Sequence, residues 1–463
     1  MQKFIENLAS YLPEIEPPKQ KHLSFKEKLK WTLIVLGLFY VLGMIPLYGL
    51  ESTALQHFEY LSIILGAKFG SLISLGIGPI VTASIVLQLL QGSGILKLDL
   101  NTSEGKRYFQ ALQKLLTIAF ILFESFVYVS MGGVRAAPGI NPWILILQLC
   151  LGGFFVMLMD EVVSKWGFGS GVSLFIAAGV SKTIAIRAFS WSTTLGGSAL
   201  AGSEYAPGAV PALLQALRNS DPVEAARRAA ELITTIFVFM IAVYAQAMKV
   251  EIPLSYGQLR GHGVRWPLSF LYTSNIPVIL VAALLANMQL WARLMENAGH
   301  PFLGTFDPAS GMPISGFVLY LSAPNIVGKL IEGTLTAGDF GRAISYMAFM
   351  MAGAVMFSVF WMRTSGLDPK SQAERIMASG LQVPGFRKDR RVLERLLARY
   401  ITPLTVMGAL AVGFLAATAD LTGALSRGTG ILLTVMIIYR LYEEISKQHL
   451  MDMNPMLRRF IRG

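Results

Sequence analysis

Cysteine and charge are both scarce in this chain. Cys150 is the only cysteine among 463 residues, and it lies inside an apolar run. A single cysteine excludes a disulfide framework, a thiolate metal cluster and a C-x-x-C redox pair. Charged residues make up 14% of the chain, whereas hydrophobic residues make up 54%. This number of polar residues is too small to cover the surface of a water-soluble protein of this size. The composition therefore predicts an integral membrane protein.

The residues that usually carry catalysis are also poorly placed. All the histidines lie outside the long apolar runs; they are His22, His57, His262, His300 and His449. An intramembrane serine protease needs a base beside its nucleophile, and a metalloprotease needs a motif such as H-E-x-x-H, which does not occur. We therefore expect no catalytic site, no metal and no cofactor.

The apolar runs predict an all-α membrane protein with ten transmembrane helices. Each run approaches the roughly 20 residues that a helix needs to cross the hydrocarbon core, and the alternating pattern of a membrane β-barrel is absent. The predicted spans are 31–50, 72–91, 111–131, 142–159, 172–189, 232–248, 276–292, 343–362, 403–420 and 428–443.

The spans divide into two five-helix halves. We predict a cytoplasmic amphipathic segment at 1–30, one half at 31–190, an external loop at 191–231, the second half at 232–446 and a cytoplasmic tail at 447–463. Most Lys and Arg residues then lie on the cytoplasmic side, as the positive-inside rule requires with both termini in the cytoplasm. Gly78-Pro79 and Pro277 interrupt the second span of each half, which suggests an inverted repeat with a pathway at its interface.

Five long motifs carry a family resemblance. They are LGIGPIVTASIVLQLLQGSG (75–94), DEVVSKWGFGSGVSLFIAAGVS (160–181), TSNIPVIL (273–280), GLDPKS (366–371) and GTGILLTV (428–435). Together they resemble the SecY family, the α subunit of the Sec protein translocation channel, in its archaeal and eukaryotic branch. The resemblance implies a pseudo-symmetric channel in the cell membrane that passes secretory polypeptides across the bilayer and releases membrane segments sideways into lipid.

A ring of apolar side chains is the first predicted site. Ile77 and Val81 are four residues apart, as are Val172 and Ile176, so each pair shares one helix face. The resemblance adds further members from the seventh and tenth spans, which are Ile279 and Leu433. Such a ring excludes water and ions by dewetting yet closes around a passing chain. Taken without the resemblance, such a pair is more simply read as ordinary lipid-facing or packing residues.

The segment between the first two spans is the predicted plug. Residues 54–65 are too short to cross the bilayer and mix polar with apolar side chains. By resemblance the plug residues are Ala54, Leu55, Phe58, Leu61, Ile64 and Leu65. The alternative is an interfacial helix without a gating role.

Polar residues within the spans are the predicted lateral gate. Thr82 and Asn287 match gate positions of the family, and Gln88 is a further candidate. They would set how hydrophobic a segment must be to enter lipid; the alternative is an ordinary structural hydrogen bond.

Basic cytoplasmic loops are the predicted partner surface. By resemblance Arg260 and Arg387 dock the ribosome, so RNA is contacted only through the ribosome. Attraction to anionic lipid of the bilayer is the simpler and compatible reading. The family also implies a SecE (γ) subunit, a small β subunit, and signal sequences with nascent polypeptides as substrates.

An ion-coupled secondary transporter is the main alternative function. Inverted repeats and broken helices are typical of transporters, but these also place ionisable residues near the membrane midplane. Glu124 is the clearest such residue here, and one carboxylate makes a poor relay.

Overall fold

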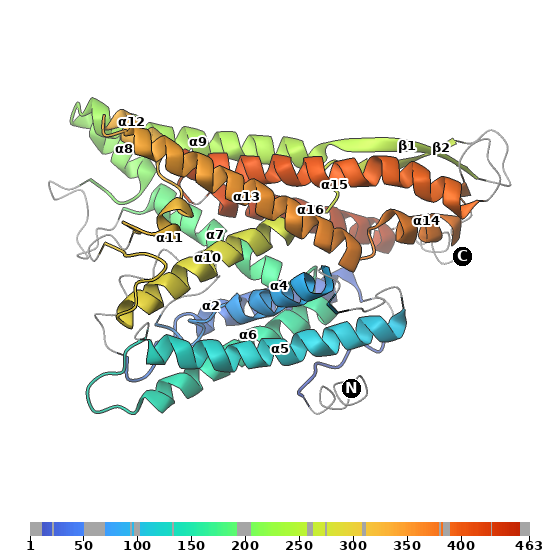
Figure 1. Cartoon of the computed structure of the whole chain (residues 1–463), viewed down its shortest axis with the longest axis horizontal. Coiled ribbons are helices and arrows are strands. Elements are labelled where there is room, and N and C mark those ends of the chain that lie inside the picture. Colours follow the sequence, from blue (N-terminus) through green and yellow to red (C-terminus); the bar gives the residue numbers. More distant parts are fainter. Residues whose placement is uncertain are drawn as a thin grey trace.

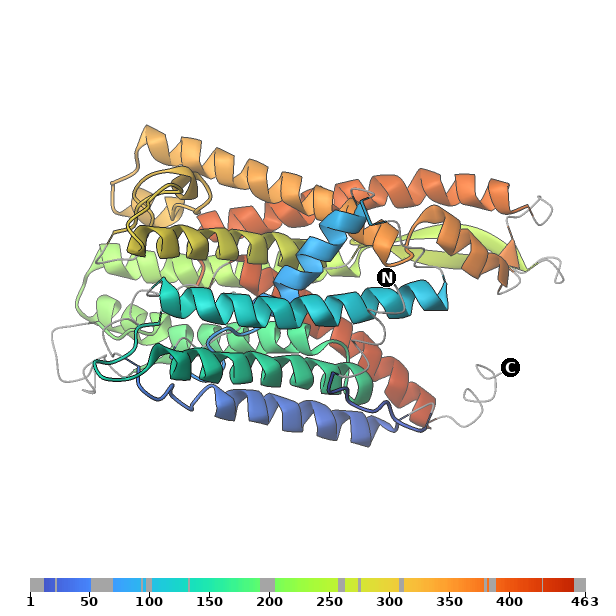
Figure 2. The same ribbon diagram turned by 60° about the horizontal axis from the view of Figure 1, so that its bottom comes forward.

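The computed structural model of the chain describes thirteen stretches, and the account below is limited to them. They are residues 12–20, 23–50, 70–92, 95–96, 102–131, 134–191, 205–256, 263–273, 276–307, 312–378, 381–382, 389–426 and 428–453. Long helices run side by side along the length of the molecule, and a small sheet lies at one end (Figure 1). The start of α2 and the end of α16 lie at the same end as the sheet (Figure 2).

A helix stands at each of the ten predicted spans. They are α2 (Phe25–Leu42), α4 (Gly78–Gly92), α5 (Ser103–Ser130), α6 (Pro142–Trp166), α7 (Gly171–Phe189), α9 (Pro222–Ala247), α10 (Ile276–Asn297), α13 (Ala337–Thr364), α15 (Arg390–Leu421) and α16 (Gly428–Met453). Shorter helices connect them: α8 (Ala209–Arg218), α11 (Phe317–Tyr320), α12 (Ile326–Ile331) and α14 (Pro369–Ala378).

Seven of these helices are long and apolar enough by themselves to cross a membrane: α5, α6, α7, α9, α10, α13 and α15. The other three fall short for local reasons. Charged residues crowd the start of α2 and the second half of α16. Helix α4 has 15 residues, so it covers only about 22 Å at 1.5 Å per residue.

The expected interruptions in the second span of each half prove to be helix starts. Residues 72–77 form turns, with Gly76 at a positive φ of 54°, and α4 begins at Gly78 with Pro79 in its first turn. Pro277 likewise stands second in α10. Proline fits the first turn because its missing N–H has no helical acceptor there. The predicted span 72–91 therefore begins with turns and becomes helical only at Gly78.

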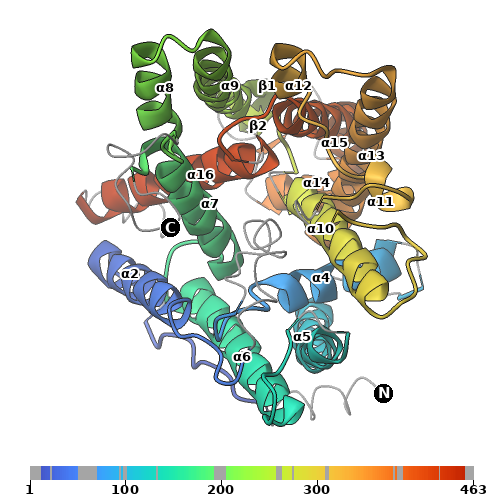
Figure 3. The same ribbon diagram turned by 90° about the vertical axis from the view of Figure 1, so that its left-hand side faces the viewer.

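The two halves enclose a central region. Viewed along the helices, α2, α4, α5 and α6 lie on one side and α9, α10, α13 and α15 on the other, while α7 and α16 lie beside each other between them (Figure 3). One large apolar cluster extends through both halves, including Leu75, Phe175, Val281 and Met350, which are at most 1% exposed.

A three-stranded sheet, which the sequence analysis did not anticipate, joins two connecting loops. Strand β1 (Lys249–Tyr256) pairs antiparallel with β2 (Gly263–Ser269), and β3 (Leu381–Gln382) pairs with the other edge of β1. The loop after α9 and the loop after α13 thus form one unit. A second apolar cluster, which includes Ile252, Ile376 and Leu397, packs this sheet against α14 and the start of α15.

Candidate functional site

A very small apolar cavity lies where α4, α7, α10 and α16 meet. Its volume is about 20 Å³, which is room for about one water molecule. It is lined by Ile77, Val81, Ile176, Val180, Ile279, Ala282, Ala283, Thr429, Gly430 and Leu433. Almost every lining group is aliphatic, so a water there finds few hydrogen-bond partners.

Five of the six predicted ring residues line this cavity: Ile77, Val81, Ile176, Ile279 and Leu433. Each is at most 7% exposed. Val172, the sixth, stands in the first turn of α7 and lines a larger neighbouring pocket together with Val81 and Ile279. The structure therefore brings five of these side chains to one constriction and places Val172 at its rim.

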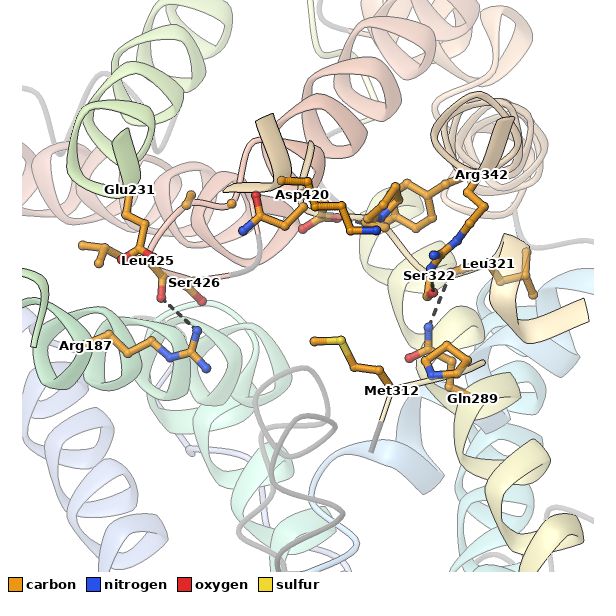
Figure 4. Close-up of a pocket in the computed structure, with 18 of the residues that line it drawn as sticks. Arg187, Glu231, Gln289, Met312, Leu321, Ser322, Arg342, Asp420, Leu425 and Ser426 are labelled. Atoms are coloured by element: carbon orange, nitrogen blue, oxygen red, sulfur yellow. Dashed lines mark hydrogen bonds between the residues drawn. The ribbon is translucent and has the colours of Figure 1, made fainter. Parts of the chain in front are cut away.

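Larger pockets lie on both sides of the constriction. One of about 640 Å³ is bordered by the end of α7 and the start of α16, at Arg187 and Ser426 (Figure 4). The other, of about 420 Å³, is bordered by the start of α7 and the later part of α16, at Ser170 and Arg440. Because α7 and α16 pass the narrow cavity between these ends, the spaces form an hourglass with an apolar waist.

The first pocket is lined by charged side chains that bond to neighbouring groups of its wall. Arg187 donates to the carbonyl of Leu425 at 3.4 Å, and Arg342 donates to Ser322 Oγ at 3.3 Å (Figure 4). Arg228 forms an ion pair with Glu231 at 3.3 Å. The polar groups of this space are thus held at its walls, and the narrow waist stays apolar.

Two of the predicted gate residues bond directly across the halves. Asn287 Nδ2 of α10 donates to Thr82 Oγ1 of α4 at 2.9 Å. Thr82 Oγ1 also lies 2.9 Å from the carbonyl of Gly78 and 3.2 Å from Glu124 Oε1 of α5. Glu124, the carboxylate that could have served a transporter, is 7% exposed and belongs to this cluster. One hydroxyl therefore links three helices, and one of those links joins the halves.

Gln88 lies apart from this cluster. It is 3% exposed and lines the pocket of about 420 Å³ together with Ser84 and Gln113. Its Oε1 has no hydrogen-bond partner among the described residues. The described contacts therefore do not connect Gln88 with Thr82 or Asn287.

An aromatic contact that the sequence analysis missed lies at the same edge. Phe123 of α5 stacks on Trp291 of α10, with ring centroids 5.6 Å apart and an interplanar angle of 28°. Stacked aromatic pairs add roughly 0.5–1.5 kcal/mol beyond the area that they bury. Neither residue stands out in the sequence, because aromatic residues make up 11% of the chain.

Two predicted sites lie outside the described residues. They are the plug, with Ala54, Leu55, Phe58, Leu61, Ile64 and Leu65, and the arginines Arg260 and Arg387. The strands and helices that flank the two arginine-bearing loops are described and form the sheet unit above. Among the described residues, no group of three or more His, Cys, Asp or Glu side chains is arranged to hold a metal ion.

Two wide pockets that meet at an apolar waist between the two halves of a helical membrane protein define a membrane channel. The waist offers no polar filter for a chosen ion, and it suits a long flexible polymer better than a small solute. The chain belongs to the SecY family, whose model matches residues 71–442.

Relatives match over almost the entire chain. Protein translocase subunit SecY of Pyrococcus furiosus is 44% identical and that of Pyrococcus horikoshii 43%; each alignment covers 98% of this chain and 97–98% of the relative. The archaeal branch and the function predicted from the motifs are thereby confirmed. The chain is a protein translocase subunit of the SecY type, the central subunit of a protein-conducting channel.

Solved structures agree with the fold. A structure described as that of a protein conducting channel matches with a TM-score of 0.81 at 42% identity, and covers 96% of this chain and 97% of its own. A SecY structure whose description states that the plug domain stabilises the closed state matches at 0.79 and 41%, with the same coverage. Sec61 from a canine ribosome-channel complex matches at 0.78 and 42%, again with the same coverage. These channels have ten transmembrane helices, as predicted for this chain.

Proposed function

We propose that polypeptides pass through this chain along the hourglass and that its apolar waist seals the resting channel. The observation that carries the proposal is the cavity of about 20 Å³, to which α4, α7, α10 and α16 each bring aliphatic side chains. A passage this narrow and apolar dewets, so ions meet an energy barrier there although no charged group blocks the passage.

The same side chains permit transport. Ile77 lies just before α4, and Val81, Ile176, Ile279 and Leu433 lie on α4, α7, α10 and α16; all five are flexible aliphatic groups. When the helices separate, these groups rest against a translocating segment of any sequence, because dispersion contacts are not directional. The ring thus acts as a flexible seal around the translocating chain, and it needs neither a cofactor nor a catalytic group.

A crosslinking experiment tests this path. The single native cysteine is replaced by Cys150→Ala, and a new cysteine is placed at the waist by Ile176→Cys. We expect Ile176→Cys to crosslink to a secretory chain stalled during translocation. The matched control is Ile186→Cys, ten residues further along the same helix and 51% exposed on the outside of the protein. Equal crosslinking at both positions, or none at Ile176→Cys, would contradict the proposed path.

We further propose that the lateral exit opens between α4 and α5 on one side and α10 and α13 on the other. Support comes from the contacts there: the Asn287–Thr82 hydrogen bond and the Phe123–Trp291 stack are side-chain contacts that can separate without breaking a helix. A hydrophobic signal segment can replace these contacts, because it offers α4 and α10 an apolar surface to pack against. The polar pair then sets how apolar that segment must be.

Residues 54–65 are proposed as the plug that rests on one side of the ring. The support is the position of the segment in the chain, directly before the turns that lead to Ile77, and its part-polar composition. A SecY structure of 41% identity is described as one whose plug domain stabilises the closed state. Deletion of 54–65 should therefore increase ion leakage through the resting channel, and unchanged conductance would contradict the assignment.

The sheet end of the molecule is proposed as the cytoplasmic ribosome-docking face. Pairing of β3 with β1 joins Tyr256 to Leu381, and each of these residues lies a few positions before one of the two arginines, Arg260 and Arg387. Sec61, a structural match, is seen in a ribosome-channel complex. Contacts to RNA phosphates weaken steeply with salt. Replacement of both arginines by Ala should therefore reduce ribosome binding and its salt dependence, whereas Arg218→Ala, at the opposite end, should change neither.

Both termini then lie in the cytoplasm, because α2 starts and α16 ends at this same end. The amphipathic stretch before α2 would lie on the inner membrane surface. A SecE (γ) subunit and a small β subunit complete the proposed assembly. Co-purification of the chain with both subunits tests this composition, and a chain that translocates without them would contradict it.

A further inference from the structure

Two carboxylates occupy equivalent places in the two halves. Asp160 stands near the end of α6, and its Oδ1 accepts a hydrogen bond from the backbone N–H of Val172, in the first turn of α7, at 2.9 Å. Asp420 stands near the end of α15, and its Oδ1 accepts from the backbone N–H of Thr429, in the first turn of α16, at 3.2 Å. In each half, the fourth helix thus supplies the N-terminal cap of the fifth.

Further donors fix each carboxylate. Ser170 Oγ lies 3.5 Å from Asp160 Oδ1. Asp420 Oδ2 accepts from the hydroxyl of Tyr346 in α13 at 2.6 Å and from the hydroxyl of Thr429. The cap of α16 thus also involves α13 through Tyr346, whereas the second donor to Asp160, Ser170, directly precedes α7 itself.

The capped helices begin at glycines that touch the preceding helix. A Cβ on Gly171 would stand 2.5 Å from Cα of Asp160, and a Cβ on Gly428 would overlap Ala419. Any larger residue would push the start of α7 or α16 away from its cap. The close approach and the cap thus specify the same helix position.

Each capped helix carries a ring residue at the same distance from its start. Ile176 and Leu433 both stand five residues after the first residue of their helix, which is about 7.5 Å along the axis. The caps act from opposite ends of the hourglass: Asp160 lines the pocket of about 420 Å³ and Asp420 that of about 640 Å³. Ile176 is thus held from one end of the molecule, and Leu433 is held from the opposite end.

We propose that Asp160 and Asp420 are paired positioning residues that set the height of Ile176 and Leu433 at the waist, and so make the resting ring close. The inference rests on the proposed sealing function of the ring. Neither carboxylate lines the narrow cavity, so both act only through the helices that they cap.

Resting ion conductance in planar bilayers, measured on the complete channel complex, tests the proposal. We expect Asp160→Ala and Asp420→Ala each to raise the conductance by about 2-fold to 30-fold, the factor that corresponds to a lost helix cap. Asp160→Asn and Asp420→Asn should stay near the wild-type level, because an amide oxygen also accepts the N–H. If the Asn variants conduct like the wild type, the aspartates act by accepting the hydrogen bonds of the helix cap and not by their charge.

Asp221→Ala is the matched control. Asp221 caps α9 by accepting from the backbone N–H groups of Val223 and Glu224, both at 3.2 Å, and α9 brings no residue to the waist. The pKa of Asp221 lies below its usual value, because the Glu224 N–H and the Tyr205 hydroxyl donate to its charged form. Loss of this cap should lower thermal stability without adding conductance.

A second pair of variants keeps the carboxylates in place. Gly171→Ala should leak, because its methyl group meets the backbone of Asp160, whereas Gly179→Ala, on the same helix with open space around it, should not. The reference is Ile176→Ser, which opens the ring directly. One outcome that overturns the inference is that Ile176→Ser leaks while the Asp→Ala and Gly171→Ala variants conduct no more than Asp221→Ala. Another is that the Asn variants leak as much as the Ala variants. If Ile176→Ser does not leak, the ring proposal itself fails and this inference fails with it.

Discussion

The two edges at which the halves meet are built differently. At the edge formed by α7 and α16, a Cβ on Gly430 would stand only 3.2 Å from Val180, and one on Gly169 would stand 3.4 Å from Leu441. At the edge formed by α4, α5 and α10, the described links are side-chain contacts such as the Thr82–Asn287 hydrogen bond. Both edges are visible in Figure 3, α7 beside α16 and α4 beside α10.

This difference shows how one molecule can be both sealed and openable. Close packing of glycine against a branched side chain tolerates little movement, because interiors are packed as densely as crystals. A hydrogen bond between side chains in a membrane contributes only about 0.6 kcal/mol on average, so it separates readily. We therefore expect the α7–α16 edge to serve as the hinge and the α4–α10 edge as the opening.

Locking the opening edge should have the largest effect. In a Cys150→Ala background, Thr82→Cys and Asn287→Cys are joined by a short bifunctional thiol-reactive crosslinker that alkylates both thiols, since the native side chains lie within hydrogen-bonding distance. We expect translocation of a secretory precursor into vesicles to be abolished, because the halves can no longer separate there.

The control lock is placed at the hinge. Val180→Cys and Gly430→Cys, joined in the same way, should leave translocation near its uncrosslinked level. Undiminished transport with the α4–α10 edge locked, or equal inhibition by both locks, would remove the distinction between the two edges.

Overpacking the hinge should have the next largest effect. Gly430→Val forces new methyl groups against Val180, and such overpacking costs about 1–3 kcal/mol in the free energy of unfolding. Thermal unfolding of the purified complex in detergent measures the change. Gly179→Val, on α7 with nothing within 4 Å, is the control and should not be destabilising. Equal stability of the two variants would show that the hinge is not tightly packed.

Removing the polar link should make the gate less selective. Asn287→Leu loses the hydrogen bond to Thr82, worth about 0.6–1.7 kcal/mol, so the closed gate becomes easier to open by about 3-fold to 18-fold. Precursors with weakly hydrophobic signal sequences should then be translocated faster, as measured in vesicles.

The control for the polar link is a threonine at the hinge. Thr183 of α7 donates only to the carbonyl of Gly179 within its own helix, so Thr183→Val should leave the signal threshold unchanged. Tighter discrimination in Asn287→Leu would argue that the bond stabilises the open state instead.

The smallest effect is expected from the aromatic stack. Phe123→Leu keeps an apolar side chain but removes the contact with Trp291, which is worth about 0.5–1.5 kcal/mol, or 2-fold to 12-fold in gate opening. The same vesicle assay with a weak signal measures it. Phe126→Leu is the control, because Phe126 contacts Trp143 of α6 within the N-terminal half, at 6.4 Å between centroids. If both variants behave alike, the stack does not hold the gate.

Much of the fold could be read from the sequence because membrane helices depend on composition over a window. All ten predicted spans contain helices, and the i, i+4 spacing of Ile77 and Val81 places both at one cavity. The first residues of the helices were harder to predict, because a Gly-Pro pair within an apolar run marks either a break in a helix or the beginning of one. The structure decided for a beginning at Gly78 and left residues 72–77 in turns.

Contacts between distant segments could not be predicted. The sheet joins Tyr256 to Leu381, more than a hundred residues apart, through backbone groups that every sequence possesses. The Phe123–Trp291 stack and the caps by Asp160 and Asp420 also depend on which helices become neighbours. In the sequence both aspartates read simply as charges near helix ends.

The sequence by itself determined that this protein lies in a membrane, that it crosses it as helices and, through its motifs, that it belongs to a family of protein-conducting channels. Those properties follow from local composition and from ordered residues along the chain. Only the tertiary structure decided which edge packs glycine closely and which edge is linked by a polar and an aromatic side-chain contact, because that depends on how α7 meets α16 and α4 meets α10. The height of the apolar ring was decided there as well, by two carboxylates from the preceding helices.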